Sequence, residues 1–538
     1  MRKLLTFVAA MLLTGSIFAG GLVTNTNQSA MFTRLQNRNA STGIDAVYYN
    51  PAGLTKLGDG FYASINNQTI GQTKTVGNDY LFLTGTPRDY VGDVSAPIYP
   101  GVYVAYKTGK LAFSGGFNPI GGGGGAKYKT GLPSFEMGIA DIVPGLASQG
   151  IPTTKYSADI NFEGSSVYFG YQGNVSYKVN DMLSVAAGVR LVSAKNTYTG
   201  YLRNISINST YPSFGAAYTG GMVLAKDFFT SGATFLNGLA ASSTSAASGL
   251  STAISTGTPA TTPLSAMPAA TVAGVTQLLG AAGISAAGMN IGTAAATLNG
   301  VAPVFTSKAN TMTANAAATQ DISVDAEQTG MGYTPILSAN FSPSEKLNIA
   351  IKYEFKTKLE LTTKVNNNKG GGIFVDGTKV VADMPAMLSL GVDYKPMTKL
   401  TLSASFNTYF DKNVDYDGST TLDIKQIDKN FLEYGLGVEY GLTEKLRASC
   451  GWVATSTGVN SAYQNDQRYS TNTNSFGAGF GYRISSMIDL NIGGQYTMYA
   501  DGSKNFTHNL GTTPIPLSET YKKKTWVIGV GLDFSFGK

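Results

Sequence analysis

The most regular feature of the chain is an alternation of apolar and polar residues with a period of two. In the segment 431–441 every second residue is apolar, and glycine or glutamate stands between them: the apolar set is Leu432, Tyr434, Leu436, Val438 and Tyr440. Successive side chains of a strand point to opposite faces, whereas helical spacing would mix the two sets. The pattern therefore predicts a strand with one apolar face and one polar face.

The same alternation recurs and predicts fourteen strands. We expect them at residues 60–74, 98–107, 110–118, 164–179, 182–199, 331–342, 346–363, 384–395, 399–412, 431–441, 445–459, 473–484, 488–501 and 522–536. Bacterial single-chain membrane barrels have an even number of antiparallel strands. The expected fold class is all-β: a 14-stranded antiparallel transmembrane β-barrel with an N-terminal hatch, or plug.

The lengths of the connections follow the parity of the strands. Connections after even-numbered strands are tight, as at Thr108-Gly109 and Asn180-Asp181, whereas those after odd-numbered strands are long. Membrane barrels have short periplasmic turns and longer extracellular loops, and a soluble β-sandwich gives no reason for such sorting. We therefore expect both termini in the periplasm and a long extracellular loop at residues 200–330.

The N-terminus has the features of a secretory signal peptide. Arg2 and Lys3 precede an apolar run over residues 4–13, and small residues up to Ala19 supply a cleavage site. Ten apolar residues are too few to span a bilayer as a helix. The expected organisation is a signal peptide at 1–19, a hatch at 20–59 and the barrel at 60–538.

Composition excludes several classes of function. Only 13% of residues are charged, against about 25% in soluble domains. A net charge of +6 with one basic run, at residues 522–524, implies no nucleic-acid partner. His508 is the only histidine and Cys450 the only cysteine, so neither a metal cluster nor a histidine-based nucleophile pair is expected. We expect no enzyme activity, no metal and no cofactor, and we expect Cys450 to face lipid.

A motif ahead of the first strand resembles a known family. The residues that carry the resemblance are Asp45, Tyr48, Tyr49, Asn50, Pro51, Ala52, Gly53 and Leu54. Together with fourteen strands, they are similar to the FadL long-chain fatty acid transporter family, which includes channels for toluene and related hydrocarbons. The resemblance implies a hatch that plugs the barrel and assigns gating to Asn50, Pro51, Ala52 and Gly53. The alternative is that these residues form a simple turn that anchors the plug.

The resemblance also implies a sideways exit where the third strand is kinked. In this chain that position holds Gly115, Gly116, Asn118 and Pro119. Proline cannot donate a ladder hydrogen bond and glycine weakens a strand, so the wall has a physical reason to open here. The alternative is that these residues only begin a flexible loop.

Residues 228–307 contain no Asp, Glu, Lys or Arg. The passage 269–282 carries Val272, Val275, Leu278 and Leu279 at helical spacing after Pro268, which predicts a helix. An uncharged, apolar extracellular cap suits the capture of hydrophobic solutes, and similar loops of the family carry a first ligand groove. We assign ligand capture to Phe228, Phe229, Phe235 and Leu236; a low-complexity surface loop is the alternative.

The sequence thus predicts an outer-membrane protein that imports long-chain fatty acids or similar hydrophobic molecules by passive diffusion. Its expected partners are a hydrophobic small molecule, such as a fatty acid or hydrocarbon, and outer-membrane lipid, and the expected state is a monomer. A diffusion porin for other small solutes and a surface adhesin or structural barrel stay open as alternatives.

Loop parity makes the topology testable. Epitope tags placed within residues 200–330 should be accessible to antibody on intact cells, because that loop is expected outside. Tags inserted after Thr108 or Asn180 should become accessible only after permeabilisation. The reverse result would overturn the topology.

Overall fold

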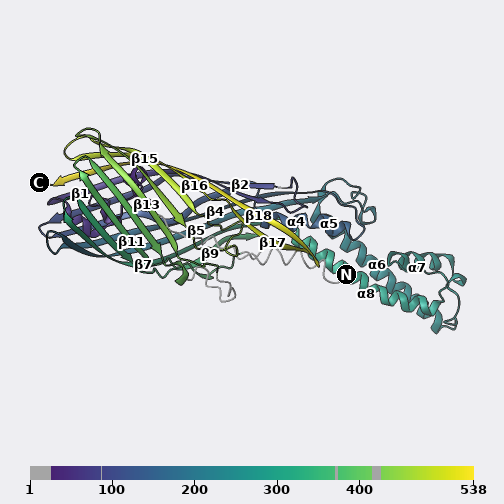
Figure 1. The fold of residues 1–538 in the computed structure, drawn as a ribbon. Helices are drawn as coiled ribbons and strands as arrows, with labels where there is room; N and C mark the ends of the chain where they lie inside the picture. The colour runs from purple at the N-terminus through teal and green to yellow at the C-terminus, as the bar shows by residue number, and fades with distance from the viewer. Residues whose placement is uncertain (1–25, 87, 370–373, 415–425, 538) are drawn as a thin grey trace.

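The structure is a computed structural model that describes residues 26–86, 88–369, 374–414 and 426–537. The predicted signal peptide, residues 1–19, lies outside the described residues. Figure 1 shows a tilted-strand barrel, with the C-terminus at one end and a helical projection at the other.

Fourteen antiparallel strands form the closed wall of the described chain, which confirms the predicted fold class. In chain order they are β1 (Gly60–Asn78), β2 (Arg88–Thr108), β3 (Leu111–Tyr128), β4 (Tyr156–Lys178), β5 (Leu183–Ile207), β7 (Ile322–Ser344), the pair β8 (Leu347–Glu354) and β9 (Glu360–Lys369), β11 (Met387–Met397) with its short extension β10 (Lys379–Val381), β12 (Leu400–Tyr409), β13 (Phe431–Gly441), β14 (Leu446–Ser456), β15 (Thr473–Arg483), β16 (Ile488–Tyr499) and β18 (Thr513–Gly537). β1 pairs with β18 from Gly60↔Gly537 to Asn78↔Glu519 and closes the barrel.

Two details of the strand prediction are wrong. Several strands extend well beyond the predicted limits; β5, for example, has 25 residues. Their outer halves carry inward side chains such as Tyr198, Leu202 and Tyr521, which pack into an apolar core at the loop end and so extend the ladder. The predicted strand 346–363 is also broken into β8 and β9, because residues 355–359 bulge and turn Leu359 into the interior.

Short turns lie at one end of the barrel and long loops at the other, here called the short-turn end and the loop end. The loop between β3 and β4 carries the helices α4 (Pro133–Ala140) and α5 (Ile142–Ala147). The remaining short elements of the loop end are η2 (Pro212–Phe214), β6 (Val223–Leu224), η4 (Asp411–Asn413) and β17 (Gly502–Leu510), which pairs with the outer part of β18.

Residues 225–318, which include the uncharged segment, form a helical stalk that projects from the loop end (Figure 1). It consists of α6 (Ala225–Ser255), η3 (Leu264–Ala266), α7 (Ala269–Ala281) and α8 (Ile291–Ala318). The helix predicted over 269–282 is confirmed as α7. The longer helices α6 and α8 pack against each other along their length, where alanine and a few large apolar residues meet.

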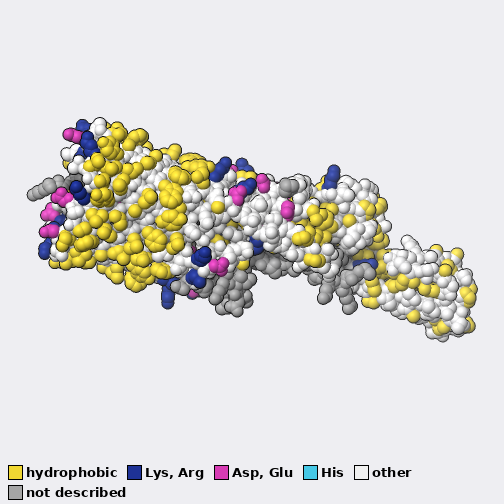
Figure 2. Space-filling model, viewed as in Figure 1, with side chains coloured by type: hydrophobic (Ala, Val, Ile, Leu, Met, Phe, Trp, Pro, Cys, Tyr) yellow, Lys and Arg dark blue, Asp and Glu magenta, His cyan; other side chains and the backbone are white. Residues whose placement is uncertain are grey.

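The outer face of the wall is apolar over the half nearest the short turns. Figure 2 shows hydrophobic side chains covering this half, with charged side chains at its two margins and few on the stalk. Cys450 is exposed on this face, as the alternation predicts. No helix in the described part of the chain is long and apolar enough to cross a membrane.

Candidate functional site in the barrel interior

The segment before β1 folds into a plug, defined here as residues 26–59, which is buried within the barrel. Its elements are α2 (Ala30–Leu35), α3 (Ala46–Tyr49) and η1 (Pro51–Lys56). α2 begins at Ser29, whose Oγ accepts a hydrogen bond from the amide of Phe32 at 3.0 Å, and ends at Gln36 in the left-handed conformation. The segment therefore has local reasons to be helical.

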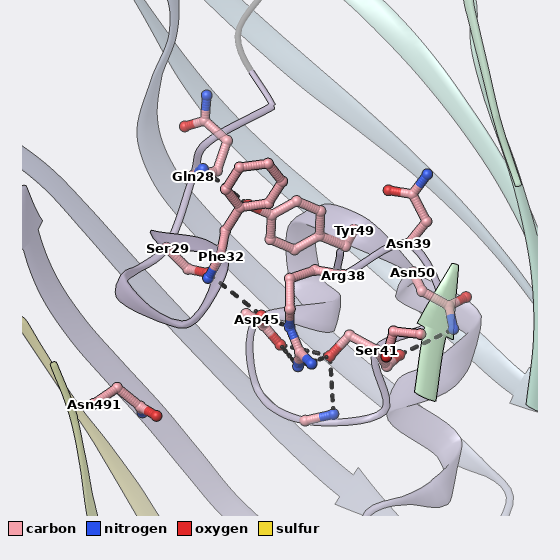
Figure 3. Close-up of polar contacts among 12 residues, drawn as sticks. Gln28, Ser29, Phe32, Arg38, Asn39, Ser41, Asp45, Tyr49, Asn50 and Asn491 are labelled. Atoms are coloured by element: carbon pink, nitrogen blue, oxygen red, sulfur yellow. Dashed lines mark hydrogen bonds and ion pairs between the residues drawn. The ribbon is translucent and has the colours of Figure 1, made fainter. Parts of the chain in front are cut away.

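An ion pair holds the turn between α2 and α3 together (Figure 3). The guanidinium of Arg38 donates to both carboxylate oxygens of Asp45 at 2.7 and 2.8 Å, and Ser41 Oγ donates to the same carboxylate. Burial alone would raise the pKa of Asp45, but the charge of Arg38 and these hydrogen bonds outweigh it and lower the pKa below its ordinary value. The carboxylate is thus ionised and tied to Arg38.

Glycines on the inner face of the wall make room for α2. A Cβ added at Gly451 would lie 1.9 Å from the carbonyl oxygen of Leu35, and one at Gly493 would lie 2.7 Å from the amide nitrogen of Arg34. Arg34 itself forms an ion pair with Glu439 and donates to Asn491 Oδ1 at 3.1 Å. The plug therefore fits β13–β16 by close backbone contact and by buried polar bonds.

The turn at Asn50, Pro51, Ala52 and Gly53 is bonded to three wall strands near the short-turn end. Asn50 Nδ2 donates to Ser41 O at 3.0 Å and to Asn340 Oδ1 of β7 at 2.7 Å. Three wall serines also bond the turn: Ser176 and Ser184 donate to the carbonyls of Pro51 and Ala52, and Ser338 accepts from the amide of Ala52. A Cβ at Gly53 would lie 2.4 Å from Ser41 O, so only glycine fits. In this conformation the turn anchors the plug.

The third wall strand has a break in its ladder. Gly115 and Gly116 are paired on both sides, with β2 and β4. Beyond Phe117, however, β3 loses its β2 partner: residues 95–101 and 118–125 are not paired with each other, and pairing resumes at Val94↔Ala126. Of the four residues assigned to a lateral opening, Asn118 and Pro119 lie at this break, whereas Gly115 and Gly116 lie just before it.

Side chains span the break. The hydroxyl of Tyr99 in β2 donates to the carbonyl of Pro119, and buried Asn118 donates to the side-chain oxygen of Gln28 in the plug. A second interruption lies between β7 and the β8–β9 strand, but there the backbones are in tight contact: a Cβ at Gly330 would lie 2.2 Å from Glu360 O. The side chains of Thr334 and Thr357 also form a hydrogen bond across this second interruption. The β2–β3 break differs because Asn118 links it to the plug.

One buried cation cluster in the interior contains its own carboxylate. Arg190 binds Glu354 through two hydrogen bonds of 2.6 and 2.9 Å, and Lys352 binds the same group at 2.7 Å. Both cations also lie over the ring of Tyr48 in the plug, at 4.9 and 4.5 Å from its centroid. This cluster joins β5 and β8 to the plug.

A second pair of interior cations has no such partner. Lys74 of β1 and Lys523 of β18 are direct cross-strand partners. Along β18 the even-numbered residues Trp526 and Ile528 are exposed on the outer face, so the odd-numbered Lys523 and its partner Lys74 point inward. Lys523 Nζ lies 5.0 and 5.1 Å from the ring centroids of Tyr469 and Tyr499. Across the described ranges no ion pair involves either lysine, although like charges directly opposite each other destabilise a sheet. This arrangement favours an anion.

The four residues assigned to ligand capture lie at the base of the stalk. Phe228, Phe229 and Leu236 are buried, and Phe235 is partly buried, in contacts that include Phe214. In this structure they join the stalk to the loop-end core. Their role in capture stays a prediction.

Sequence reasoning missed the lysine pair, Tyr99 and the plug arginines. The sequence does contain one sign of the lysine pair. In the run 522–524, strand alternation places the middle lysine on the face that points into the barrel. Among residues 26–537, leaving aside the gaps given above, no group of three His, Cys, Asp or Glu side chains is placed to hold a metal ion.

Comparisons with known proteins agree with this architecture. The family model described as outer membrane protein transport protein (OMPP1/FadL/TodX) matches residues 284–536. A Pseudomonas aeruginosa FadL homologue has a similar structure, with a TM-score of 0.57 and 14% identity over 96% of this chain and 100% of that one. The P. putida toluene transporter TodX follows, with a TM-score of 0.50 and 12% identity over 93% and 95%. No curated protein matches the sequence.

The anchored turn generates a prediction about the plug. Replacing Asn50 by Ala removes two buried hydrogen bonds, at a cost of about 1–3 kcal/mol, although Asn348 still donates to Asn340 Oδ1. We expect a looser plug and therefore more frequent and larger ion-conducting openings in planar bilayers. The exposed Asn366 supplies the control, Asn366→Ala. Equal conductance of both variants and the parent would show that this turn does not hold the plug shut.

Proposed function

We propose that this chain, an outer-membrane β-barrel of the OMPP1/FadL/TodX family, admits apolar molecules that carry a carboxylate, with long-chain fatty acids as the ligand class. Transport of hydrophobic molecules across the bacterial outer membrane follows from the family; the finer assignment is ours. The observation that carries it is the lysine pair Lys74 and Lys523 above the plug.

The lysine pair supports a ligand with an anionic head. Lys523 Nζ lies against two tyrosine rings, and within the described residues neither lysine has a carboxylate partner. A ligand carboxylate would therefore offset the repulsion between the two lysines. The cluster at Arg190 offers less to a ligand, because Glu354 already occupies its donors. An apolar chain attached to the carboxylate gains about 0.8 kcal/mol for each methylene removed from water.

The break between β2 and β3 supports a sideways exit. A ligand that leaves through the wall enters the bilayer directly and does not expose its chain to the aqueous periplasm again. Tyr99 would act as the closing side chain, and Asn118 would link the break to Gln28 of the plug. Asn50, Pro51, Ala52 and Gly53 would then hold the plug fixed at its wall end while the part near Gln28 moves.

The same features weigh against the two alternatives. A general diffusion porin needs a continuous water path, whereas the plug buries its polar groups against the wall. An adhesin gives no reason for an interior lysine pair or for a broken ladder. The family consists of transport channels, and we propose no reaction for this chain.

The lysine pair can be tested by ligand class. The double variant Lys74→Met and Lys523→Met should bind oleate about tenfold or more weakly, because it loses charge-assisted bonds of about 1.5–3 kcal/mol each. Binding of an uncharged hydrocarbon such as toluene should not change. Titration calorimetry on the detergent-purified barrel measures both affinities.

The control for that titration is Lys195→Met, which changes an exposed lysine paired with Glu327. An unchanged oleate affinity in the double variant, or an equal loss for toluene, would contradict a carboxylate site here.

The exit can be tested by closing the break. In a Cys450→Ala background, cysteines replace Ser95 and Gly125, the first unpaired residues beyond Val94↔Ala126, so that a disulfide would join β2 to β3 at the edge of the break. The oxidised barrel should bind oleate normally but transport it slowly, and reduction should restore uptake by cells.

A matched disulfide controls for stiffening of the wall. Val104 and Gly115 are already paired, so cysteines there should leave uptake unchanged. Normal uptake by a verified 95–125 cross-link would mean that ligand leaves through the periplasmic end.

A further inference from the structure

An apolar groove of about 1040 Å³ lies on the outer face of β12–β16 and β18. One cross-strand row of large side chains forms its wall toward the loop end: Leu436, Trp452, Phe476, Tyr496 and Trp526. The next row toward the short-turn end forms its floor, and its middle members are small: Cys450, Ala478 and Gly494. These two rows cross five strands, about 20 Å at the usual strand spacing.

If the loop end faces outward, as the loop lengths predict, the groove lies at the depth of the outer leaflet. The outward residues of β18 run from Phe536 near the short-turn end to Trp526, ten residues or about 33 Å along the strand. With the usual tilt of 35–45°, this length matches an apolar band about 25 Å tall. Trp526 therefore marks the edge of the band nearest the loops, and the groove lies just inside that edge.

Two cations stand directly above the groove. Lys524 and Lys522 are the next outward residues of β18 beyond Trp526, and both are exposed. Within the described residues, no ion pair involves either of them. Asp93 lies in the same cross-strand row as Lys524 but two strands away, where it accepts a hydrogen bond from Thr73. Asp501 precedes Gly502, which pairs with Tyr521, but within the described residues no ion pair joins it to Lys522. Two lysines beside one nearby carboxylate leave the charge above the groove positive.

We propose that this groove is a binding site for an anionic, phosphate-bearing lipid of the outer leaflet, with an acyl chain along the row of small residues and a phosphate at Lys522 and Lys524. The surrounding membrane supplies acyl chains to any groove on this face. The unpaired lysines at headgroup height select the charge of the lipid, since each basic residue near a membrane surface contributes about 1 kcal/mol toward an anionic lipid. A second copy of this chain would bring the same lysines and repel them.

The chain contains a built-in reporter for this site. Its only two tryptophans, Trp452 and Trp526, both line the groove. Lipids with brominated chains quench tryptophan fluorescence on contact. Because both tryptophans line the groove, the quenching reports which lipid occupies it. The experiment places the full-length barrel in bilayers of dibrominated phosphatidylcholine and replaces that lipid stepwise with unbrominated phosphatidylglycerol.

We expect phosphatidylglycerol to bind at least threefold more strongly than phosphatidylcholine, seen as fluorescence that recovers earlier than the bulk composition predicts. The variant Lys522→Gln with Lys524→Gln should bring this ratio to about one. Its control is Lys127→Gln with Lys195→Gln, which changes two exposed lysines that are paired with Glu163 and Glu327 and should keep the ratio.

A second variant tests the groove itself. Ala478→Phe fills the floor and should lower quenching by dibrominated phosphatidylcholine, while Ala187→Phe, on the outer face of β5, should not. A ratio of one in the parent protein, or a raised ratio that survives loss of both lysines, would overturn the proposal. Heat-modifiable gel mobility verifies that each variant is folded.

Discussion

The architecture depends on one constraint: inside a bilayer, every backbone N–H and C=O must find its partner within the protein. Closing β1 on β18 satisfies this for the wall as a whole. It also makes any break in the ladder costly, so a break has to be compensated. Between β2 and β3 the hydroxyl of Tyr99 donates to the carbonyl of Pro119, and at the β8–β9 bulge the amide of Phe355 donates to the carbonyl of Pro335. The two breaks in the ladder are therefore closed in different ways.

The plug must also satisfy its polar groups with partners inside the protein. Its polar residues are buried, and each anchor is a bond to the inward face of a wall strand, such as Arg34 to Asn491 or Asn50 to Asn340. Glycines on that face bring the two backbones close, which strengthens these bonds in a low dielectric. A plug held in this way cannot leave as one body at small cost.

The strand pattern was predictable because the membrane imposes it residue by residue. Period-two alternation located all fourteen wall strands and placed Cys450 on the outer face, and helical spacing located α7. The outer strand limits were not predictable, since residues such as Leu202 continue the ladder only because the loop-end core covers them. The interior contacts were hidden for a related reason: bonds from residues 26–59 to strands hundreds of residues later leave no local pattern.

In the run Lys522-Lys523-Lys524, strand alternation directs neighbouring lysines to opposite faces of the wall. Read as a cluster, it is only a weak basic patch; read by parity, it sends one ammonium group into the interior and two to the membrane surface. The inner charge meets tyrosines and Lys74, and the outer charges stand above an apolar groove. Both positions lack a carboxylate in the described structure, and both adjoin apolar surface. The same chemistry, an anionic head on a hydrocarbon chain, therefore fits each side of the wall, as we propose for a transported ligand inside and for a lipid outside.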